Sequence, residues 1–238
     1  GSPTFVRATT AWTKLSSGLW ASVASGTARS CYSGANTAAG LYIGYFPENA
    51  GTQLVTPTAS IRDMTNAAWT ATNVTVAKTG TGIDGVANSC SRLTCTSNGG
   101  TVLQTLTAAA SSRTYSAFIQ RVTGTGTITI QQGATTLDVT ASINSSTLTR
   151  VELNASVLNS AFGVIMGTSG DVILVDFNQF EAVTTATSPM DAAGAARNAD
   201  MLTYDTAIAL PASLYCEHTP FSAIGGGVSG VPVQVDNG

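Results

Sequence analysis

Short segments in which apolar and polar residues alternate dominate the middle of the chain. Residues 127–131 and 137–143 alternate at every position, and residues 115–122 form a third candidate. Because successive side chains of a β-strand point to opposite faces, this period of two predicts half-buried strands. Residues 172–180 are apolar at successive positions at first, which indicates a strand in the centre of a sandwich.

The alternation also assigns side chains to the two faces of each strand. In residues 115–122, one face carries Tyr115, Ala117 and Ile119. In residues 137–143, the inward set is Val139, Ala141 and Ile143, and the outward set is Asp138, Thr140 and Ser142. A shift of one residue would exchange these two sets, so the pattern makes a definite prediction.

Turn sequences rich in glycine separate these segments. They lie at residues 78–82, 97–100, 123–126, 133 and 169–171. Short strands joined by frequent turns predict an all-β fold, an antiparallel jelly-roll-like β-sandwich. Helix signals are weak: residues 189–197 contain several alanines, but Gly194 interrupts them and no apolar stripe follows. We therefore expect residues 184–200 to be an extended connector.

One glycine motif resembles a dinucleotide-binding fingerprint. Gly80, Gly82 and Gly85 have the spacing G-x-G-x-x-G and follow an expected strand at residues 74–78. A dinucleotide site requires a helix to begin at the third glycine, because the N-terminus of that helix holds the pyrophosphate. Residues 86–91 do not have a helical pattern, so these glycines are interpreted as turn residues.

The charge content of the chain is low. Charged residues make up 10% of the sequence and the net charge is −3, against about 25% charged residues in typical soluble domains. Such a surface suits a permanently assembled protein as well as an unusually neutral globular domain. Lys14 and Lys78 are the only lysines and the arginines are scattered, which argues against nucleic-acid binding. No apolar run approaches the ~20 residues needed to span a bilayer, so membrane insertion is not expected.

Four cysteines are too few and too irregularly spaced for a disulfide scaffold. Cys90 and Cys95 lie on one expected strand, where five residues span roughly 16 Å and point to opposite faces. Together with Cys31 and Cys216 they are predicted to be small hydrophobic residues in a protein made in a reducing cytoplasm.

The sequence offers little that could catalyse a reaction. The single histidine, His218, has no nucleophile near it in sequence, and no metal-ligand spacing occurs. Asp171, Asp176 and Glu181 lie on one strand or at its ends. We interpret them as a structural Ca²⁺ site or as solvated carboxylates rather than as a glycosidase pair. No catalytic, cofactor-binding or metal-binding residue is assigned, no cofactor is expected, and the ligand-binding residues stay unknown.

Aromatic residues raise the question of sugar stacking. Trp69 could cap a glycan platform, although an aromatic residue at the start of a strand more often closes a core. Residues 3–61 carry further aromatic residues but few regular patterns, and some of these side chains must meet a neighbouring domain or subunit. They are Trp12, Trp20, Tyr32, Tyr42, Tyr45 and Phe46. A homo-oligomer would bury them.

Several segments resemble the virion structural proteins of tailed bacteriophages. The segments, in chain order, are 5–11, 40–43, 49–54, 62–70, 84–88, 112–118, 176–181, 187–189, 197–202 and 214–218. Residues 62–70, with Asn66 and Trp69, are similar to the opening of the carbohydrate-binding-module-like sandwich of these proteins. Residues 197–202 resemble the connector that leads in such proteins to a laminin-G-like domain.

The resemblance implies a division of the chain into five parts. Residues 1–2 are interpreted as a cloning scar, 3–61 as an irregular N-terminal lead-in, 62–183 as the sandwich, 184–211 as the connector and 212–238 as the start of a further β domain. Residues 212–218 have a strand pattern, and 225–227 are expected to be loop.

The resemblance also implies a function in the virion. It suggests a non-enzymatic tail-fibre or tailspike segment, assembled in the host cytoplasm, that contacts other virion proteins and adheres to host-surface glycans. The resemblance to fibres and spikes also implies that the homo-oligomer is a homotrimer. Two alternatives stay open: a purely structural protein such as a head decoration or shaft spacer, and an accessory module of a polysaccharide-degrading enzyme.

Overall fold

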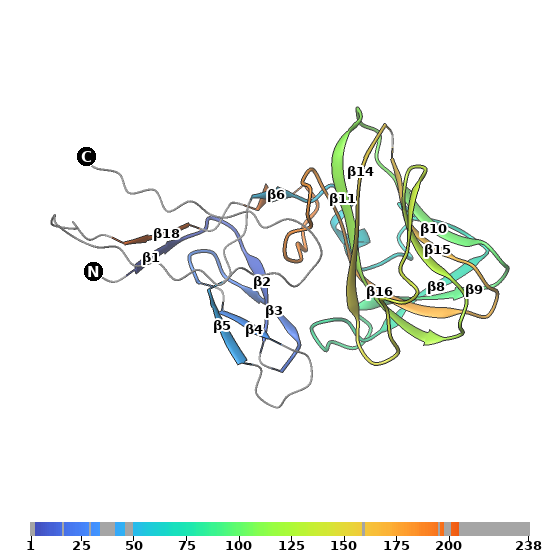
Figure 1. Cartoon of the computed structure of the whole chain (residues 1–238), viewed down its shortest axis with the longest axis horizontal. Helices are drawn as coiled ribbons and strands as arrows, with labels where there is room; N and C mark the ends of the chain where they lie inside the picture. Colours follow the sequence, from blue (N-terminus) through green and yellow to red (C-terminus); the bar gives the residue numbers. More distant parts are fainter. Residues whose placement is uncertain are drawn as a thin grey trace.

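The computed structural model describes residues 3–15, 17–28, 30–33, 41–45, 50–158, 160–194, 196–197 and 201–204. Its main body consists of two five-stranded antiparallel sheets packed face to face (Figure 1). This arrangement confirms the predicted all-β sandwich. Within the described residues, no helix is long and apolar enough to cross a membrane.

The first sheet has the strand order β13-β12-β15-β10-β7. Its strands are β7 (Thr70–Thr72), β10 (Gly100–Thr105), β12 (Ile128–Gln132), β13 (Thr135–Asp138) and β15 (Ala161–Met166). The second sheet has the order β14-β11-β16-β9-β8. Its strands are β8 (Val74–Gly80), β9 (Cys90–Cys95), β11 (Ser111–Thr123), β14 (Thr149–Val157) and β16 (Val172–Glu181).

The core between the sheets is centred on Phe162 of β15. Its ring stacks on Phe180 of β16 at a centroid distance of 4.4 Å and lies 5.4 Å from the ring of Tyr115 of β11. Trp69 approaches Phe162 edge-on at 5.7 Å, and its indole N–H donates to the carbonyl of Ser60 at 2.9 Å. The core interpretation of Trp69 is therefore confirmed. Fully desolvated aromatic side chains of this size contribute a large share of the hydrophobic stabilisation.

Three predicted strands occur where the alternation placed them. β12 and β16 match the expected segments, and Tyr115, Ala117 and Ile119 of β11 are buried together. Cys90 and Cys95 are buried free thiols at the two ends of β9, as expected. The expected strand at residues 74–78 is present as β8, which continues to Gly80, a residue assigned to a turn. No helix follows Gly85, so the motif lacks the helix that a dinucleotide site requires. Gly82 and Gly85 lie in a turn as predicted, whereas Gly80 is the last residue of β8.

The predicted strand at residues 137–143 is wrong in its second half. β13 ends at Asp138, and the next residues form a turn in which the N–H groups of Ser142 and Ile143 donate to the carbonyl of Val139. Val139 and Ile143 are buried, but Ala141 is exposed. In a turn of this kind, side chains three or four residues apart point inward. Buried Val139 and Ile143 are therefore compatible with both a turn and a strand, and only the exposed Ala141 distinguishes the two.

Short strands precede the sandwich. They are β1 (Pro3–Val6), β2 (Ala11–Lys14), β3 (Trp20–Val23), β4 (Ser30–Ser33), β5 (Leu41–Tyr45) and β6 (Gly51–Thr52), followed by the 3₁₀ turn η1 (Thr58–Ile61). β2 and β3 form a hairpin, here called the lead-in hairpin, that packs against the sandwich. β4 pairs with β5.

Two further strands follow the sandwich and return to the lead-in. β17 (Ala196–Arg197) pairs with β6, and β18 (Met201–Tyr204) pairs with β1, both antiparallel. Figure 1 shows β1 and β18 side by side, well away from the two sheets. We call these two strand pairs the stem. Residues 205–238, with the expected further β domain and His218, lie outside the described residues, as does Phe46.

Candidate functional site

The most strongly connected charged group is Arg62, which follows η1. Its guanidinium donates to Asp176 of β16 through Nε (2.8 Å) and Nη2 (3.0 Å), and to Asp84 through Nη1 (2.7 Å) and Nη2 (3.0 Å). Ser89 Oγ accepts a further bond at 3.0 Å. The planar guanidinium fork matches two carboxylates at once, so this arrangement joins three distant segments of the chain.

The two carboxylates of this cluster differ in their electrostatics. Burial acts to raise the pKa of Asp84, but hydrogen bonds from Arg62 and from the Val86 N–H, together with the Arg62 charge, hold that pKa below its usual value. Asp176 is fully buried, and this desolvation raises its pKa despite the contacts with Arg62 and with the N–H groups of Ile83 and Phe177. Both carboxylates are saturated with donors, which favours a structural role.

Arg62 also contacts an aromatic ring at a strained position. Its guanidinium lies 4.4 Å from the ring centroid of Phe177, which has φ +45° and interrupts the register between β11 and β16. A bulky residue rarely adopts a positive φ, so neighbouring contacts must hold it there. The ring of Trp12 packs edge-on against Phe177 at 4.8 Å, which supplies such a contact.

A second group also consists of an arginine, a phenylalanine of the sandwich and a tryptophan of the lead-in hairpin. The guanidinium of Arg150 lies 5.5 Å from the ring centroid of Phe118, and Trp20 packs edge-on against that ring at 5.7 Å. The backbone N–H of Trp20 also donates to the backbone carbonyl of Ile83 at 2.9 Å. The two tryptophans of the lead-in hairpin thus each cover one phenylalanine of the sandwich. This meets the expectation that these aromatic residues contact a neighbouring part, and that part is the chain's own sandwich.

The carboxylates predicted to be solvated are in fact buried. Asp171, Asp176 and Glu181 are exposed by 2%, 0% and 0%. Glu181 accepts bonds from the side chain of Gln179 and from the N–H and hydroxyl groups of Thr187. Asp171 lies 3.6 Å from Arg121. Asp176 and Glu181 lie apart on β16, and Asp171 directly precedes that strand. Within the part of the chain that the structure describes, no three potential ligands gather as a metal site would require.

The buried polar side chains of β16 fix the segment that follows the sandwich. The side-chain carbonyl of Gln179 accepts the N–H of Met190 at 3.0 Å, and the side-chain carbonyl of Gln53 accepts the N–H groups of Val55 and Phe180. The carbonyl of Gln53 accepts the N–H of Gly194 at 2.9 Å. The residues after the sandwich are therefore folded back and hydrogen-bonded to it over 187–194, rather than extended.

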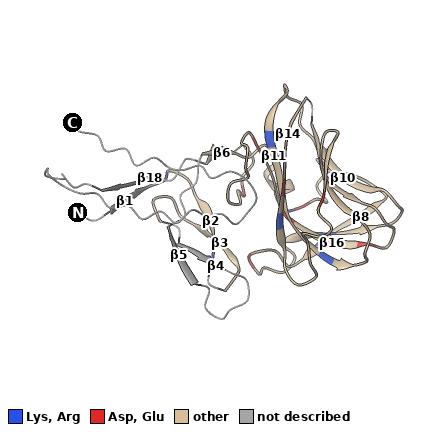
Figure 2. Cartoon of the chain, viewed as in Figure 1, with Lys and Arg blue, Asp and Glu red and all other residues tan. Residues whose placement is uncertain are grey.

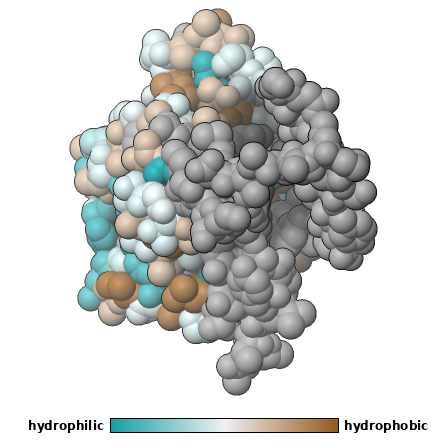
Figure 3. Space-filling model, turned by 90° about the vertical axis from the view of Figure 1, so that its left-hand side faces the viewer, coloured by the Kyte–Doolittle hydropathy of each residue, from teal (hydrophilic) through white to brown (hydrophobic). Residues whose placement is uncertain are grey.

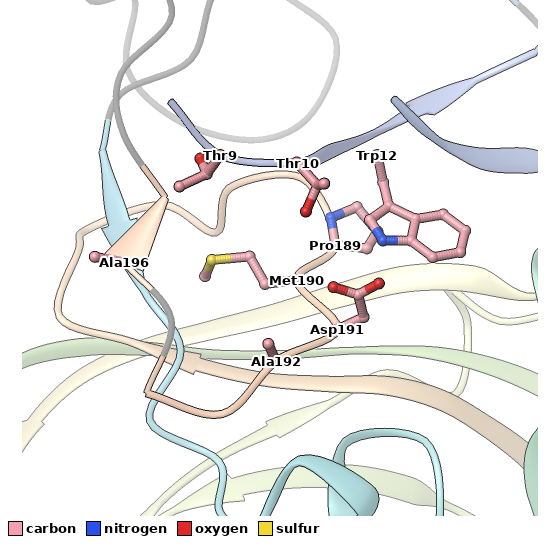
Figure 4. Close-up of a pocket in the computed structure, with 8 residues that line it drawn as sticks. All are labelled: Thr9, Thr10, Trp12, Pro189, Met190, Asp191, Ala192 and Ala196. Atoms are coloured by element: carbon pink, nitrogen blue, oxygen red, sulfur yellow. The ribbon is translucent and has the colours of Figure 1, made fainter. Parts of the chain in front are cut away.

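A pocket lies where the lead-in meets this returning segment. It has a volume of about 180 Å³ and is partly open to solvent. Its lining residues are Thr9, Thr10 and Trp12 from the lead-in, and Pro189, Met190, Asp191, Ala192 and Ala196 from the returning segment (Figure 4). We call it the seam pocket. Sequence analysis missed it, because its two walls come from opposite ends of the described chain.

Figure 2 shows that Lys, Arg, Asp and Glu are few and scattered along the described part of the chain. In Figure 3, the hydrophobic residues of the described surface lie in separate spots between hydrophilic ones, without one continuous apolar patch on that face. The exposed large apolar side chains agree with this, because they belong to different elements: Leu15, Leu19, Val86, Val122, Leu137 and Leu158. Isolated apolar residues of this kind are ordinary on a protein surface.

These features define an antiparallel β-sandwich module with a lead-in hairpin packed on one sheet and a stem of two strand pairs. No protein-family model matches the sequence, and no curated protein matches it.

Three solved structures are similar to it at low identity. The xylan-binding domain CBM22-1 of Paenibacillus barcinonensis Xyn10C is 13% identical with a TM-score of 0.43, over 58% of this chain and 99% of that one. The enzymatically active domain of bacteriophage CBA120 tailspike protein 4 is 10% identical with a TM-score of 0.37, over 54% of this chain and 21% of that one. The C-terminal CBM6 of LamC, a marine laminarinase from Zobellia galactanivorans, is 11% identical with a TM-score of 0.33, over 51% and 94%. Likenesses this distant do not bear on function.

Proposed function

We propose that this chain is a non-catalytic display module of a bacteriophage virion protein, which holds a β-sandwich away from the rest of the particle for contact with host-surface glycans. The observation that carries the proposal is the stem, in which β1 pairs with β18 and β6 pairs with β17. The chain therefore approaches and leaves the sandwich on the same side. A spacer in line with a fibre would instead receive the chain at one end and release it at the other.

The stem is connected to the sandwich through the lead-in hairpin. Arg7 is buried and donates to the carbonyls of Thr9, Val23 and Ala24 at 2.7, 3.2 and 2.6 Å, which fixes the start of the lead-in hairpin. The hairpin is fixed in turn by Trp12 and the sandwich. Polar contacts thus join the end of β1 to the hairpin, and aromatic contacts join the hairpin to the sandwich, which supports a display role.

The absence of catalysis is part of the proposal. The two carboxylates of the Arg62 cluster, the partly exposed Asp84 and the buried Asp176, are both bound to that guanidinium, so they are poorly placed to exchange a proton with a substrate. We expect the protein to release no reducing ends from purified host lipopolysaccharide or capsule. Release by this chain, abolished by heat denaturation, would contradict the proposal.

A purely structural virion role is the second candidate, and one observation favours it. The described aromatic side chains of the sandwich are buried: Trp69, Tyr115, Phe118, Phe162, Phe177 and Phe180. The described sandwich surface thus offers no aromatic platform on which a sugar could stack.

A binding experiment separates the two candidates. The full chain is applied to a glycan array and to intact host cells, with heat-denatured protein as the control. Saturable binding that a soluble host glycan competes away supports display for adhesion. Binding no stronger than the control in both assays would contradict the adhesive role and favour the purely structural one.

A further inference from the structure

We infer that the seam pocket binds one neutral pyranose ring of a glycan, held between the lead-in and the returning segment. The inference rests on the proposed function and gives it a location outside the two sheets. It starts from the eight residues that line the pocket, which bring a carboxylate, two hydroxyl groups and an apolar floor together in one hollow.

The size of the pocket limits the ligand to a single ring. Its volume is about 180 Å³. A cavity of about 150 Å³ accepts benzene, and pockets for drug-sized ligands are about 300–1,000 Å³. The seam pocket therefore accommodates one six-membered ring but not a disaccharide. Because it is partly open, the remainder of a longer glycan would extend into solvent.

The chemistry of the lining matches a sugar better than it matches an apolar ring. Trp12, Pro189 and Met190 provide apolar surface, which suits the C–H groups of a pyranose. The hydroxyl groups of Thr9 and Thr10 exchange hydrogen bonds with sugar hydroxyls. Most ligand pockets combine apolar walls with a few polar groups in this way.

Asp191 determines the charge of the ligand. It is exposed, and it is the one ionisable residue among those that line the pocket. A carboxylate accepts hydrogen bonds from neutral sugar hydroxyls, and such charge-assisted bonds are stronger than neutral ones. The same carboxylate repels an acidic sugar such as a uronic acid. Figure 4 shows Met190 between the Thr9–Ala196 end of the pocket and the Trp12–Asp191 end.

Both walls of the pocket are fixed before a ligand arrives. Met190 is held by Gln179, and the N–H of Ala193 donates to Thr58 Oγ1 at 3.0 Å. On the opposite wall, the ring contact with Phe177 fixes Trp12. Preorganised walls reduce the entropic cost of binding, which matters for a ligand as small as one ring.

The methionine methyl groups provide a direct test in the full-length chain. Met190 lines the pocket, whereas Met64 and Met166 are buried in the core between the sheets. The protein is labelled with ¹³C at the methionine methyls and titrated with the methyl pyranosides of glucose, galactose and mannose. We expect at least one sugar to shift the Met190 resonance saturably while the Met64 and Met166 resonances stay in place.

Variants locate the effect. Ala192→Leu fills the pocket and should abolish the Met190 shift, whereas Ala141→Leu adds the same side chain at an exposed turn and should leave it unchanged. Asp191→Asn should weaken binding about fivefold to tenfold, because a bond to a charged acceptor becomes a neutral one. Asp138→Asn, at an exposed position of β13, is its control. Methyl glucuronide should bind more weakly than methyl glucoside.

The outcomes separate this inference from the proposed function. Glycan binding by the chain that leaves the Met190 methyl unmoved, or that survives Ala192→Leu, overturns the seam pocket and leaves display for adhesion standing. A chain that binds neither arrays nor host cells overturns both. A Met190 shift that Ala192→Leu removes and Ala141→Leu retains supports the inference.

Discussion

At the scale of single residues, Arg62 shows how a chain with few charges uses them. Its guanidinium is the common partner of Asp84 and Asp176, and it also covers the ring of Phe177. Gly82 passes so close that a Cβ there would lie 2.3 Å from Arg62 Nη2, so only glycine fits. Breaking such a cluster by removing one partner leaves a buried charge without compensation, which costs more than the pair itself contributes.

The lowered pKa of Asp84 predicts a pH-dependent stability. A carboxylate whose pKa is lower in the folded than in the unfolded state stabilises the fold above its unfolded pKa of about 4. That contribution is lost as the pH falls through the lower folded-state pKa. We expect Asp84→Asn to reduce the free energy of unfolding by about 1 kcal/mol at pH 7. The loss is modest because the carboxylate is partly exposed, so that solvent screens part of its attraction to Arg62.

Urea denaturation at pH 7 and pH 3 checks this prediction. The difference between Asp84→Asn and the unmodified chain should shrink at pH 3, because this pH lies below the unfolded-state pKa and the unfolded chain then binds a proton. Asp191→Asn, at an exposed position, serves as the control for a change of net charge. A deficit of equal size at both pH values would contradict the assignment of the ion pair to Asp84.

At the scale of elements, the turn that replaces the second half of the expected strand changes what substitutions should do. Val139 is buried, so Val139→Asp should cost about 3 kcal/mol or more by burying a carboxylate without a partner. Ala141→Asp should be nearly neutral, although alternation would place Ala141 inside. Thr140→Asp should cost about 1 kcal/mol, because the Thr140 hydroxyl exchanges hydrogen bonds with the N–H and carbonyl of Ile128.

Melting temperatures of the three variants decide between the turn and the strand. The turn predicts that Val139→Asp melts far below the others, with Ala141→Asp close to the unmodified chain. Similar large decreases in melting temperature for Val139→Asp and Ala141→Asp would indicate that residues 137–143 form a strand.

The elements also show how much of the fold can be predicted from the sequence. β12 alternates as a strand does, and β14 alternates equally well, with Val151 and Leu153 toward the core. β16 begins with a run of apolar, mostly β-branched residues, which is typical of a central strand. β15 is short and apolar on both faces, which periodicity cannot distinguish from a buried helical turn. The seam pocket and the Arg62 cluster join segments far apart in sequence, and no local pattern carries that information.

At the scale of the whole molecule, the tryptophans of the lead-in hairpin give no support to an oligomer. Trp12 and Trp20 are accounted for by contacts with the sandwich, so they do not require a second subunit. The trimer expectation now rests on the low charge density, which reduces the desolvation cost of a subunit contact, and on the resemblance to virion proteins.

We still expect the full-length protein to be a homotrimer. Light scattering or mass photometry at several concentrations measures this directly. The lead-in hairpin should keep its place in monomer and trimer alike, because its tryptophans are covered within one chain. A full-length monomer at all concentrations would contradict the trimer and weaken the virion-appendage proposal.

The stem has a consequence for how such a module spreads among proteins. Because β1 and β18 lie side by side, the points at which the chain goes toward the sandwich and returns from it are close together. A domain with neighbouring ends can be inserted into a surface loop of another protein, or removed from it, without changing the distance between the flanking parts. Recombination could therefore exchange one sandwich for another on an unchanged stem, and the binding specificity would change while the architecture of the host protein is preserved.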